Sequence, residues 1–596
     1  MFLNTENCEQ TTNFLNGVLK SLPTYNGLWF PKEIPQMEPN FFINLPHLEF
    51  YDLANQVLSK LLHENNLEKI IKKAYNFPVV VKELSNKLYI LETFHGPTLT
   101  FKDFGARFMA FYLESKLKKY NQNYHVLVST SGDTGSAIAS AFYNKSNLKV
   151  TILYPKNRIS SVQELQMTTF DNNVTSYALD TSFDECQTLV KKSFTDAELN
   201  QFTNILSANS INLARLLPQC LYYFYSYGQL VKKYGNKIKN KVVFIIPSGN
   251  CGNLVGGLIA KKMGLPIKRF IVGQNDNDTF VRFLNDNLYL AKDTIKTISN
   301  AMDVGDPSNY KRIFHMYKNN LSKLKKEVQG FKISESDTLQ GIREMYAKYN
   351  YIIDPHTSVG YQAHLKSNQP DEYHIIVSTA APIKFHEIIE KELNIKLANN
   401  TILENLKLKP KTKISIKPSY DFLKRNLKFR TKKRSFTFIG MPGTGKSTIS
   451  KLLSEELNIK LLELDEHIEN NHHMNLFQLI KKYGEKGFKE IEEQGMLTID
   501  FTEPLIVSTG GSVIYSENGM NSLVKNSEII YLNTSFDLIM KRTENLTNRG
   551  IVFNGKTPLE LYRERHELYR KYCHYEIETN VLNETETINI IKNNIF

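Results

Sequence analysis

The sequence contains few cysteines and no long apolar run. The cysteines are Cys8, Cys186, Cys220, Cys251 and Cys573. They lie far apart and form no CxxC pair, which argues against a disulfide framework and against a zinc site built from cysteine. No apolar stretch approaches the ~20 residues needed to cross a bilayer, and the polar N-terminus lacks a basic-then-apolar signal segment. We therefore expect a cytoplasmic protein without a membrane partner.

The length of the chain excludes a single compact core. The chain has 596 residues, whereas a domain has ~100 to 200. Hydrophobic residues make up 41% and charged residues 23%, which is close to the averages of globular proteins and excludes disorder of the whole chain. We expect two or more folded domains.

The excess of positive charge gathers in one segment. Lys and Arg number 74 against 61 Asp and Glu, a net charge of +13, and Lys424–Arg434 reads KRNLKFRTKKR. The preceding Lys407–Lys417 adds further lysines. Because no nucleic-acid recognition motif accompanies this charge, it favours a solvated connector over a nucleic-acid partner. We place a basic linker at 427–434.

Short apolar runs alternate with small polar loops and helical patterns on both sides of this linker. The runs are His125–Ser129, Val150–Tyr154, Val242–Ile246 and His374–Val377 before it, and Phe436–Ile439, Lys460–Leu464, Leu505–Ser508 and Glu528–Leu532 after it. Continuous apolar runs are typical of parallel strands buried on both faces. The pattern predicts two α/β regions, 1–426 and 435–596.

The second region opens with a phosphate-binding loop. Residues 440–448 read GMPGTGKST, which satisfies GxxxxGK[ST] between a predicted strand and a helical pattern. Gly440, Gly443 and Gly445 let backbone N–H groups wrap the phosphates of ATP. Lys446 neutralises charge, and Ser447, followed by Thr448, offers a hydroxyl to Mg²⁺. The predicted cofactor of this region is ATP with Mg²⁺.

Residues beyond the loop make this region resemble the shikimate kinase family. The resemblance rests on ELDEHIE at 463–469, TGG at 509–511, NRG at 548–550 and ERHELY at 564–569. It implies Asp465 as the base at the acceptor hydroxyl, and Gly510 and Gly511 as the turn against the substrate. The arginines that it implies are Arg542 beside adenine, Arg549 as the phosphate clamp of the lid, and Arg565 on the substrate carboxylate.

Three departures from this family leave the acceptor open. Lys489 stands where the family has a substrate-binding arginine, Ser512 replaces the third glycine of GGG, and Glu463 replaces an aspartate. Lysine keeps the charge but loses the bidentate fork that reads a carboxylate. Shikimate is the expected acceptor. The alternatives are L-homoserine, whose product would feed the first region, and a module that senses ATP without catalysis.

The first region offers the parts of a pyridoxal phosphate site. Lys102 lies in the apolar stretch HGPTLTFKDF, where a desolvated lysine is a candidate nucleophile. The strand-following turns SGDTG at 131–135 and SGNCGN at 248–253 are phosphate-binding candidates, and Ser378–Pro382 presents a hydroxyl. A reactive lysine, phosphate cradles and a hydroxyl for a pyridine nitrogen are what this cofactor requires.

These motifs make residues from about Gly27 to about Leu423 resemble threonine synthase, a pyridoxal phosphate enzyme of fold-type II, like the tryptophan synthase β-subunit. The resemblance implies that Lys102 carries the cofactor and that Thr379 contacts its ring nitrogen. The implied cofactor-phosphate residues are Ser248, Gly249, Asn250, Gly252 and Asn253. The implied substrate residues are Ser131, Asp133 and Thr134, with Lys156, Arg158, Asn209, Asn212 and Arg215 as candidates for the substrate phosphate.

The resemblance implies conversion of O-phospho-L-homoserine and water to L-threonine and phosphate. Together the two regions predict a bifunctional enzyme of small-molecule substrates. The sequence leaves the oligomeric state open.

Overall fold

The computed structural model describes residues 1–24, 26–120, 122–367, 369, 371–427, 434–543 and 556–595. The chain divides into two compact units. The first comprises Met1–Val174 and Phe183–Leu408, and the second comprises Thr175–Ser182 and Lys409–Phe596. Most of the expected linker at 427–434 lies outside the described residues, so its boundaries stay a prediction.

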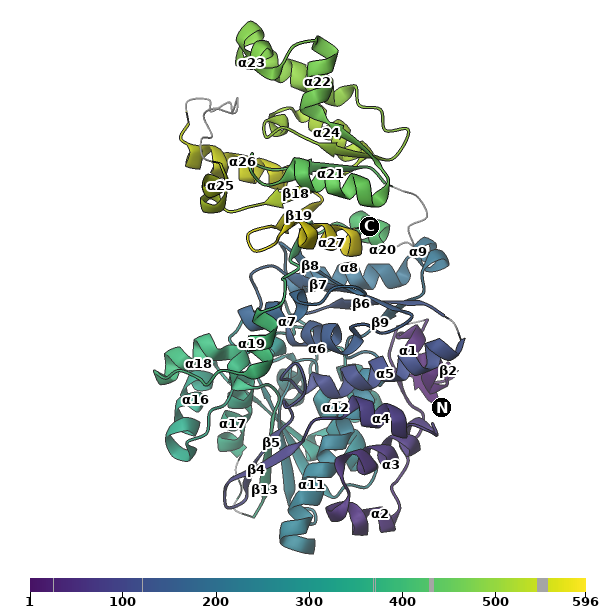
Figure 1. The fold of residues 1–596 in the computed structure, drawn as a ribbon. Coiled ribbons are helices and arrows are strands. Elements are labelled where there is room, and N and C mark those ends of the chain that lie inside the picture. Colours follow the sequence, from purple (N-terminus) through teal and green to yellow (C-terminus); the bar gives the residue numbers. More distant parts are fainter. Residues whose placement is uncertain are drawn as a thin grey trace. The chain divides into compact units, whose positions relative to one another are not determined.

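The first unit contains a six-stranded sheet in the order β12-β11-β10-β13-β5-β4. The strands are β4 (Val80–Ser85), β5 (Leu88–Glu92), β10 (Val242–Pro247), β11 (Ile267–Gln274), β12 (Val328–Lys332) and β13 (Tyr373–Ser378). All neighbours are parallel except β4 and β5. Helices α11 (Leu221–Tyr234) and α17 (Pro355–Ser367) run beside this sheet (Figure 1). The carboxyl ends of β10 and β13 therefore meet at one edge.

A second group of parallel strands lies in the same unit, in the order β7-β6-β9. These are β6 (Tyr124–Ser129), β7 (Leu148–Pro155) and β9 (Ile205–Ser207), and β6 leads through a short turn into α6 (Asp133–Phe142). Helix α5 (Lys102–Tyr120) packs against α6. A Cβ on Gly105 of α5 would lie 2.3 Å from the carbonyl oxygen of Arg215, so this glycine permits the close approach of the two segments.

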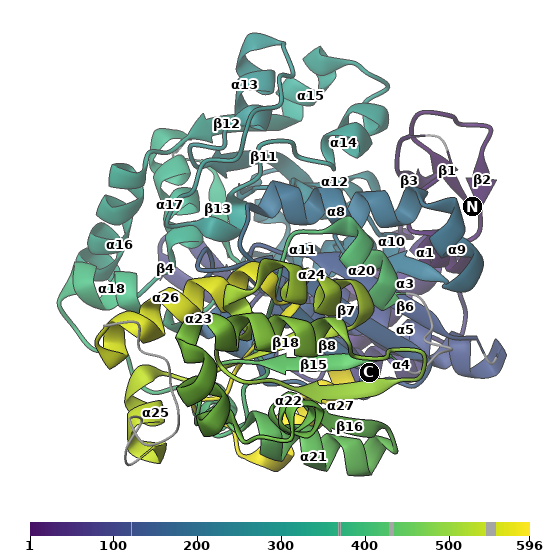
Figure 2. The same ribbon diagram turned by 90° about the horizontal axis from the view of Figure 1, so that it is seen from above.

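The second unit is built on a sheet in the order β16-β17-β15-β18-β19-β14-β8. The strands are β8 (Val174–Leu179), β14 (Ile414–Ile416), β15 (Phe436–Ile439), β16 (Lys460–Glu463), β17 (Leu505–Ser508), β18 (Glu528–Asn533) and β19 (Tyr575–Glu578). Only β14 and β19 pair antiparallel. Figure 2 shows β15 and β16 beside α21 (Lys446–Leu457) and α22 (Leu464–His472). The predicted strands of both regions are confirmed within two residues at their ends.

The interpretation of Lys407–Lys417 as a solvated connector is wrong. Its C-terminal part forms β14, whose three residues are all buried, and β14 pairs with β8 and β19. Ile414 and Ile416 supply β-branched side chains that suit a buried strand. The flanking Lys413 and Lys417 concealed this short strand, because each contributes charge but lies outside it.

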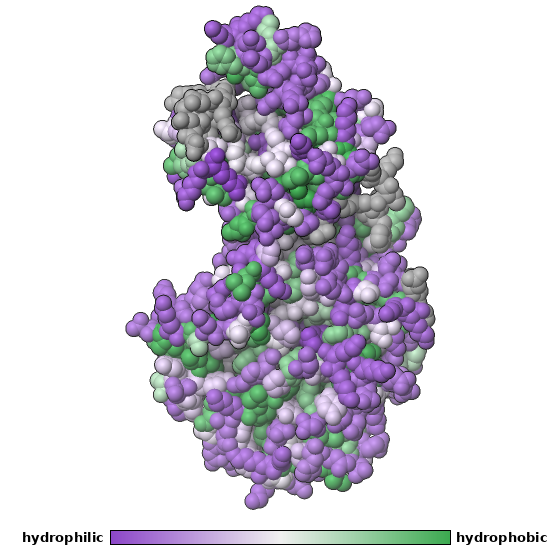
Figure 3. All heavy atoms as spheres, viewed as in Figure 1, coloured by the Kyte–Doolittle hydropathy of each residue, from purple (hydrophilic) through white to green (hydrophobic). Residues whose placement is uncertain are grey.

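The surface is predominantly hydrophilic, and Figure 3 shows hydrophobic residues in small separate patches on one face. All five cysteines are free. Within the described ranges, no helix is long and apolar enough to cross a membrane.

Candidate active sites

One cavity of the first unit brings together loops from the ends of three strands. Its wall includes Lys102 with Phe101, residues of the turn after β6, residues of the turn after β10, and Thr379 after β13. Among the predicted residues, those that line it are Lys102, Ser131, Asp133, Thr134, Asn209, Arg215, Ser248, Gly249, Asn250, Gly252, Asn253 and Thr379. The turns after β10 and β13 meet because the carboxyl ends of neighbouring parallel strands share an edge, whereas the turn after β6 comes from the second group of parallel strands.

The segment before Lys102 is fixed by hydrogen bonds at both of its ends. The Asp103 carboxylate accepts bonds from the backbone and hydroxyl of Thr98, at 2.9 and 2.6 Å. The backbone N–H of Phe101 donates to the Thr379 carbonyl at 2.9 Å, and the Thr100 hydroxyl donates to the same oxygen at 3.1 Å. Lys102 and Thr379 are therefore held on neighbouring backbone segments.

Burial lowers the pKa of Lys102 to about 8, although the nearby carboxylate of Asp133 opposes this shift. Its ammonium lies 6.0 Å from the centre of the Phe101 ring. At neutral pH a fraction of this lysine is the neutral amine, which is the nucleophilic form.

The turn after β10 has the features of a phosphate cradle. Ser248 Oγ and Asn253 Nδ2 are buried polar atoms that have no hydrogen-bond partner among the described residues. The hydroxyls of Tyr222 and Tyr223 donate to Asn253 Oδ1 at 2.7 and 2.6 Å, which leaves Nδ2 as a donor. Helix α12 (Gly252–Lys262) begins here and adds its N-terminal dipole. These unsatisfied groups fit the phosphate of pyridoxal phosphate.

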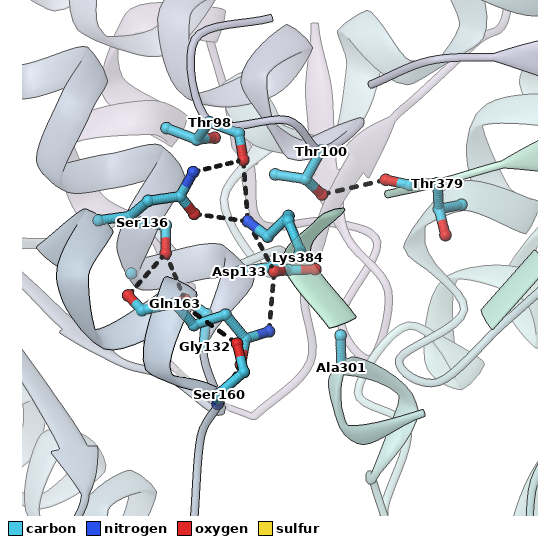
Figure 4. A network of polar contacts seen from close by, with 12 residues as sticks. Thr98, Thr100, Gly132, Asp133, Ser136, Ser160, Gln163, Ala301, Thr379 and Lys384 are labelled. Carbon is cyan, nitrogen blue, oxygen red and sulfur yellow. Dashed lines mark hydrogen bonds and ion pairs between the residues drawn. The ribbon is translucent and has the colours of Figure 1, made fainter. Parts of the chain in front are cut away.

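Asp133, the first residue of α6, lies in a buried polar network (Figure 4). Its Oδ1 accepts from Lys384 Nζ at 3.0 Å and from Gln163 Nε2 at 2.9 Å. Burial alone would raise the pKa of Asp133, but the ammonium groups of Lys384 and Lys102 hold this pKa well below its usual value. Asp133 is therefore an oriented carboxylate in the cavity wall.

The structure does not bring every predicted residue to this cavity. Lys156, Arg158 and Asn212 are absent from its wall, whereas Arg215 is part of it. Asn212 is fully buried and donates to Val18 O and Ser207 O at 2.8 and 2.9 Å. It also caps α10 (Leu213–Leu216), so its side chain is committed to the backbone.

Lys384 and Gln219 are two buried polar residues at this cavity that sequence reasoning missed. Lys384 lies behind the wall and pairs with Asp133. Gln219 lines it, and its Oε1 has no partner among the described residues. Neither residue lies in a glycine-rich turn, so no local signal marked them.

A second cavity, in the second unit, surrounds the phosphate-binding loop. Predicted residues in its wall are Gly443, Gly445, Lys446, Ser447, Thr448, Asp465, Gly510, Gly511, Arg542 and Arg565. Lys446 donates to the carbonyls of Gly440 and Met441 at 2.9 and 3.0 Å, and burial lowers its pKa to about 8. Gly440 is not in the cavity wall. Its φ of +151° shows that it contributes to the shape of the turn.

Two carboxylates face the glycine turn of this cavity. A Cβ on Gly510 would lie 3.1 Å from Asp465 Oδ1 and 3.3 Å from Glu492 Oε1. Burial raises the pKa of Glu492 to about 7, even though Ser512 donates a hydrogen bond to it at 2.7 Å. Burial also raises the pKa of Asp465. Ser512 thus contacts the acceptor side of the cavity.

Three other predicted residues of this region have different outcomes. Arg565 is 1% exposed, and its Nη1 lies 2.9 Å from the position of a Cβ on Gly511. Lys489 is not in the cavity wall, and its ammonium lies 5.0 Å from the centre of the Tyr515 ring. Arg549 lies outside the described residues. Within the described ranges, no group of three or more His, Cys, Asp or Glu residues is arranged to hold a metal.

Comparisons with known proteins match these two sites to two families. Residues 1–75 match the model "Threonine synthase N terminus", residues 74–378 match "Pyridoxal-phosphate dependent enzyme", and residues 442–595 match "Shikimate kinase". The threonine synthase of Buchnera aphidicola subsp. Baizongia pistaciae is 39% identical over 430 residues, which cover 71% of this chain and 98% of that protein.

Two further similarities concern threonine synthase from Escherichia coli. The curated protein is 39% identical over 391 residues, which cover 65% of this chain and 90% of that protein. The crystal structure superimposes with a TM-score of 0.66 and 36% identity, and it covers 71% of this chain and 98% of that chain.

Proposed function

Since this chain belongs to the threonine synthase family, we propose that its first site converts O-phospho-L-homoserine and water to L-threonine and phosphate. The observation that supports this most is the convergence of Lys102 with the unsatisfied Ser248 Oγ and Asn253 Nδ2 in one cavity. The second region carries a shikimate kinase domain, and we propose that it is catalytic.

In the first site, the cofactor residues have separate tasks. Ser248 and Asn253 would hold the cofactor phosphate, and Thr379 would offer its hydroxyl to the ring nitrogen. Pyridoxal phosphate supplies an electron sink for charge that develops on the substrate carbons. Lys102 would hold the cofactor, and its amine would move protons at Cα and Cβ of the substrate.

The substrate of the first site requires an anion-binding group for its own phosphate. Arg215 and Asn209 line the cavity, and the buried Nε of Arg215 has no partner among the described residues. We assign the substrate phosphate to these two residues, and we do not assign it to Asn212. Lys156 and Arg158 stay predictions that the cavity wall does not support.

In the second site, Lys446 neutralises charge on the transferred phosphate, Ser447 offers a ligand to Mg²⁺, and Asp465 takes the proton of the acceptor hydroxyl. Arg565 supplies a guanidinium for an acceptor carboxylate. Arg549 and Arg542 keep their proposed roles at the phosphates and at adenine.

Shikimate is the first candidate for the acceptor, because Asp465, the glycine turn and Arg565 follow the order of the family. L-homoserine is the second, and one observation favours it. The cavity wall contains two carboxylates, Asp465 and Glu492, whereas Lys489, at the position of the second expected guanidinium, is outside it. A carboxylate pair suits an acceptor that carries an ammonium group.

The acceptor is tested with the intact chain, ATP, Mg²⁺ and either shikimate or L-homoserine. Threonine formed from homoserine must be lost both in Lys446→Ala and in Lys102→Ala, because it requires both sites. Shikimate phosphorylation must be lost in Lys446→Ala alone. Threonine from homoserine with shikimate left unphosphorylated would refute shikimate as the acceptor, and turnover of neither acceptor would refute both.

A further inference from the structure

Lys384 is a fully buried lysine in the short helix Pro382–Phe385 that follows β13. Its ammonium donates to Thr98 O at 2.8 Å and to Gln166 Oε1 at 2.7 Å, and it pairs with Asp133 Oδ1 at 3.0 Å (Figure 4). An ammonium has three N–H donors, so its capacity is used completely. Burying such a charge is costly unless it is paired. Lys384 is charged and buried although it does not line the cavity, so its ammonium needs another explanation.

The neighbouring groups hold Asp133 in one orientation. Gln163 Nε2 donates to the same Oδ1, while Gln163 Oε1 accepts from the backbone of Ser160 and from Asn300, both at 3.0 Å. A Cβ on Gly132 would lie 2.4 Å from the Gln163 carboxamide carbon, so the turn and the amide fit closely. The Asp133 carboxylate is therefore bound from two sides.

Asp133 and Lys102 line the same cavity, but among the described residues Lys102 makes no ion pair with any carboxylate. The charged groups that act on Lys102 are Asp133, Arg215 and Lys384. Those that act on Asp133 are Lys384, Lys102 and His356. Without Lys384, Lys102 would carry the only ammonium beside the buried Asp133 in the part of the chain that the structure describes.

We propose that Lys384 is a positioning residue of the first site, whose buried ammonium binds Asp133 and so leaves the Lys102 amine free to bond the cofactor and accept protons. A lysine locked in a buried ion pair with aspartate would be a poor nucleophile, because its neutral form would be scarce. The inference rests on the proposed function of Lys102. It adds a residue that acts through Asp133 and does not itself contact the cofactor.

The test measures how fast the apoprotein bonds pyridoxal 5′-phosphate at Lys102, from about pH 6 to about pH 10. The bond is reduced with borohydride at fixed times, and the modified Lys102 peptide is quantified by mass spectrometry. Only the neutral amine reacts, so the rate reaches half its maximum at the pKa of Lys102, which is about 8. Catalytic turnover is not involved in this readout.

The two single variants are expected to move this midpoint in opposite directions. Asp133→Asn removes a negative charge and lowers it by about one pH unit, whereas Lys384→Met removes a positive charge and raises it by about one pH unit. In the double variant, the loss of Lys384 shifts the midpoint much less than it does in the wild type, because Asp133, through which Lys384 acts, is gone. Lys391→Met, which alters an exposed lysine in α18 (His386–Leu393), is the matched control and leaves the midpoint unchanged.

A purely structural role of Lys384 gives a different result. A midpoint that stays unchanged or falls in Lys384→Met overturns the proposal. If that variant fails to fold, Lys384→Gln, which removes the charge but keeps a hydrogen-bond donor, must raise the midpoint in its place. Borohydride labelling of another lysine in the wild type overturns the proposed function and this inference with it, whereas labelling at Lys102 without the opposite shifts overturns this inference alone.

Discussion

Replacing Glu492 by glutamine is expected to stabilise the second unit increasingly as the pH rises. Glu492 is 3% exposed, and burial raises its pKa to about 7 from its ordinary value of 4.5. As the pH rises between these two values, the unfolded chain releases the proton before the folded chain does. The wild type therefore loses stability over this interval, while glutamine, which does not ionise, avoids the loss.

The size of this effect follows from the pKa difference. One pKa unit corresponds to about 1.4 kcal/mol, so the wild type loses about 3 kcal/mol in total, most of it between about pH 5 and about pH 8. Glutamine keeps an acceptor oxygen for the Ser512 hydroxyl, which contacts Glu492 at 2.7 Å. The free energy of unfolding gained by Glu492→Gln is therefore expected to be larger at about pH 8 than at about pH 5, by about 2 kcal/mol.

Urea unfolding at about pH 5 and at about pH 8 measures this free energy for the wild type and the variant. The chain has a single tryptophan, Trp29, which lies in the first unit, so its fluorescence reports that unit while far-UV circular dichroism follows both. Glu490→Gln, an exposed position on the same helix, is the control and should change little. A gain that is equal at both pH values, or one that Glu490→Gln reproduces, would refute the reasoning.

Four further outcomes are expected. Lys102→Ala should lose the visible absorbance of the bound cofactor and threonine formation but keep kinase activity, and retained threonine formation would contradict the assignment of Lys102. Lys446→Ala should lower kinase turnover by about 10³-fold or more, as a coupled assay of ADP release measures. Gly249→Ala should weaken cofactor binding by at least about tenfold, because a Cβ would lie 2.7 Å from Met302 Cα, and reconstitution of the apoprotein followed by absorbance checks this. As the pH rises through about 7 and Glu492 ionises, KM should fall for an acceptor with an ammonium group and rise for shikimate, and a pH profile of KM distinguishes the two.

The sequence predicted the sheets well where strands are buried on both faces. β10 reads VVFIIP and is buried throughout, so its apolar run was visible without any knowledge of its neighbours. β14 escaped prediction, because a three-residue strand between lysines has no pattern of its own and is defined by β8 and β19 on either side. Pairing partners that are distant in the sequence cannot be read locally.

The candidate sites show the same limit. Lys102, Ser248 and Lys446 lie in motifs whose spacing carries the chemistry, and the structure brings each of them into a cavity. Asn212 was misplaced, because a motif cannot tell whether an amide faces a ligand or is occupied by the backbone. Lys384 was missed because it lies in no motif. Its contact with Asp133 joins two segments that are distant in the sequence.

The hydrogen bond from Thr100 to the carbonyl of Thr379 joins residues that are 279 positions apart. A ribosome adds about 5 to 20 residues per second, so roughly 15 to 60 seconds separate the synthesis of the two partners. During that interval the nascent chain has Lys102 without the segment that fixes its neighbours. The cavity around Lys102 therefore cannot be complete before Thr379 has been synthesised.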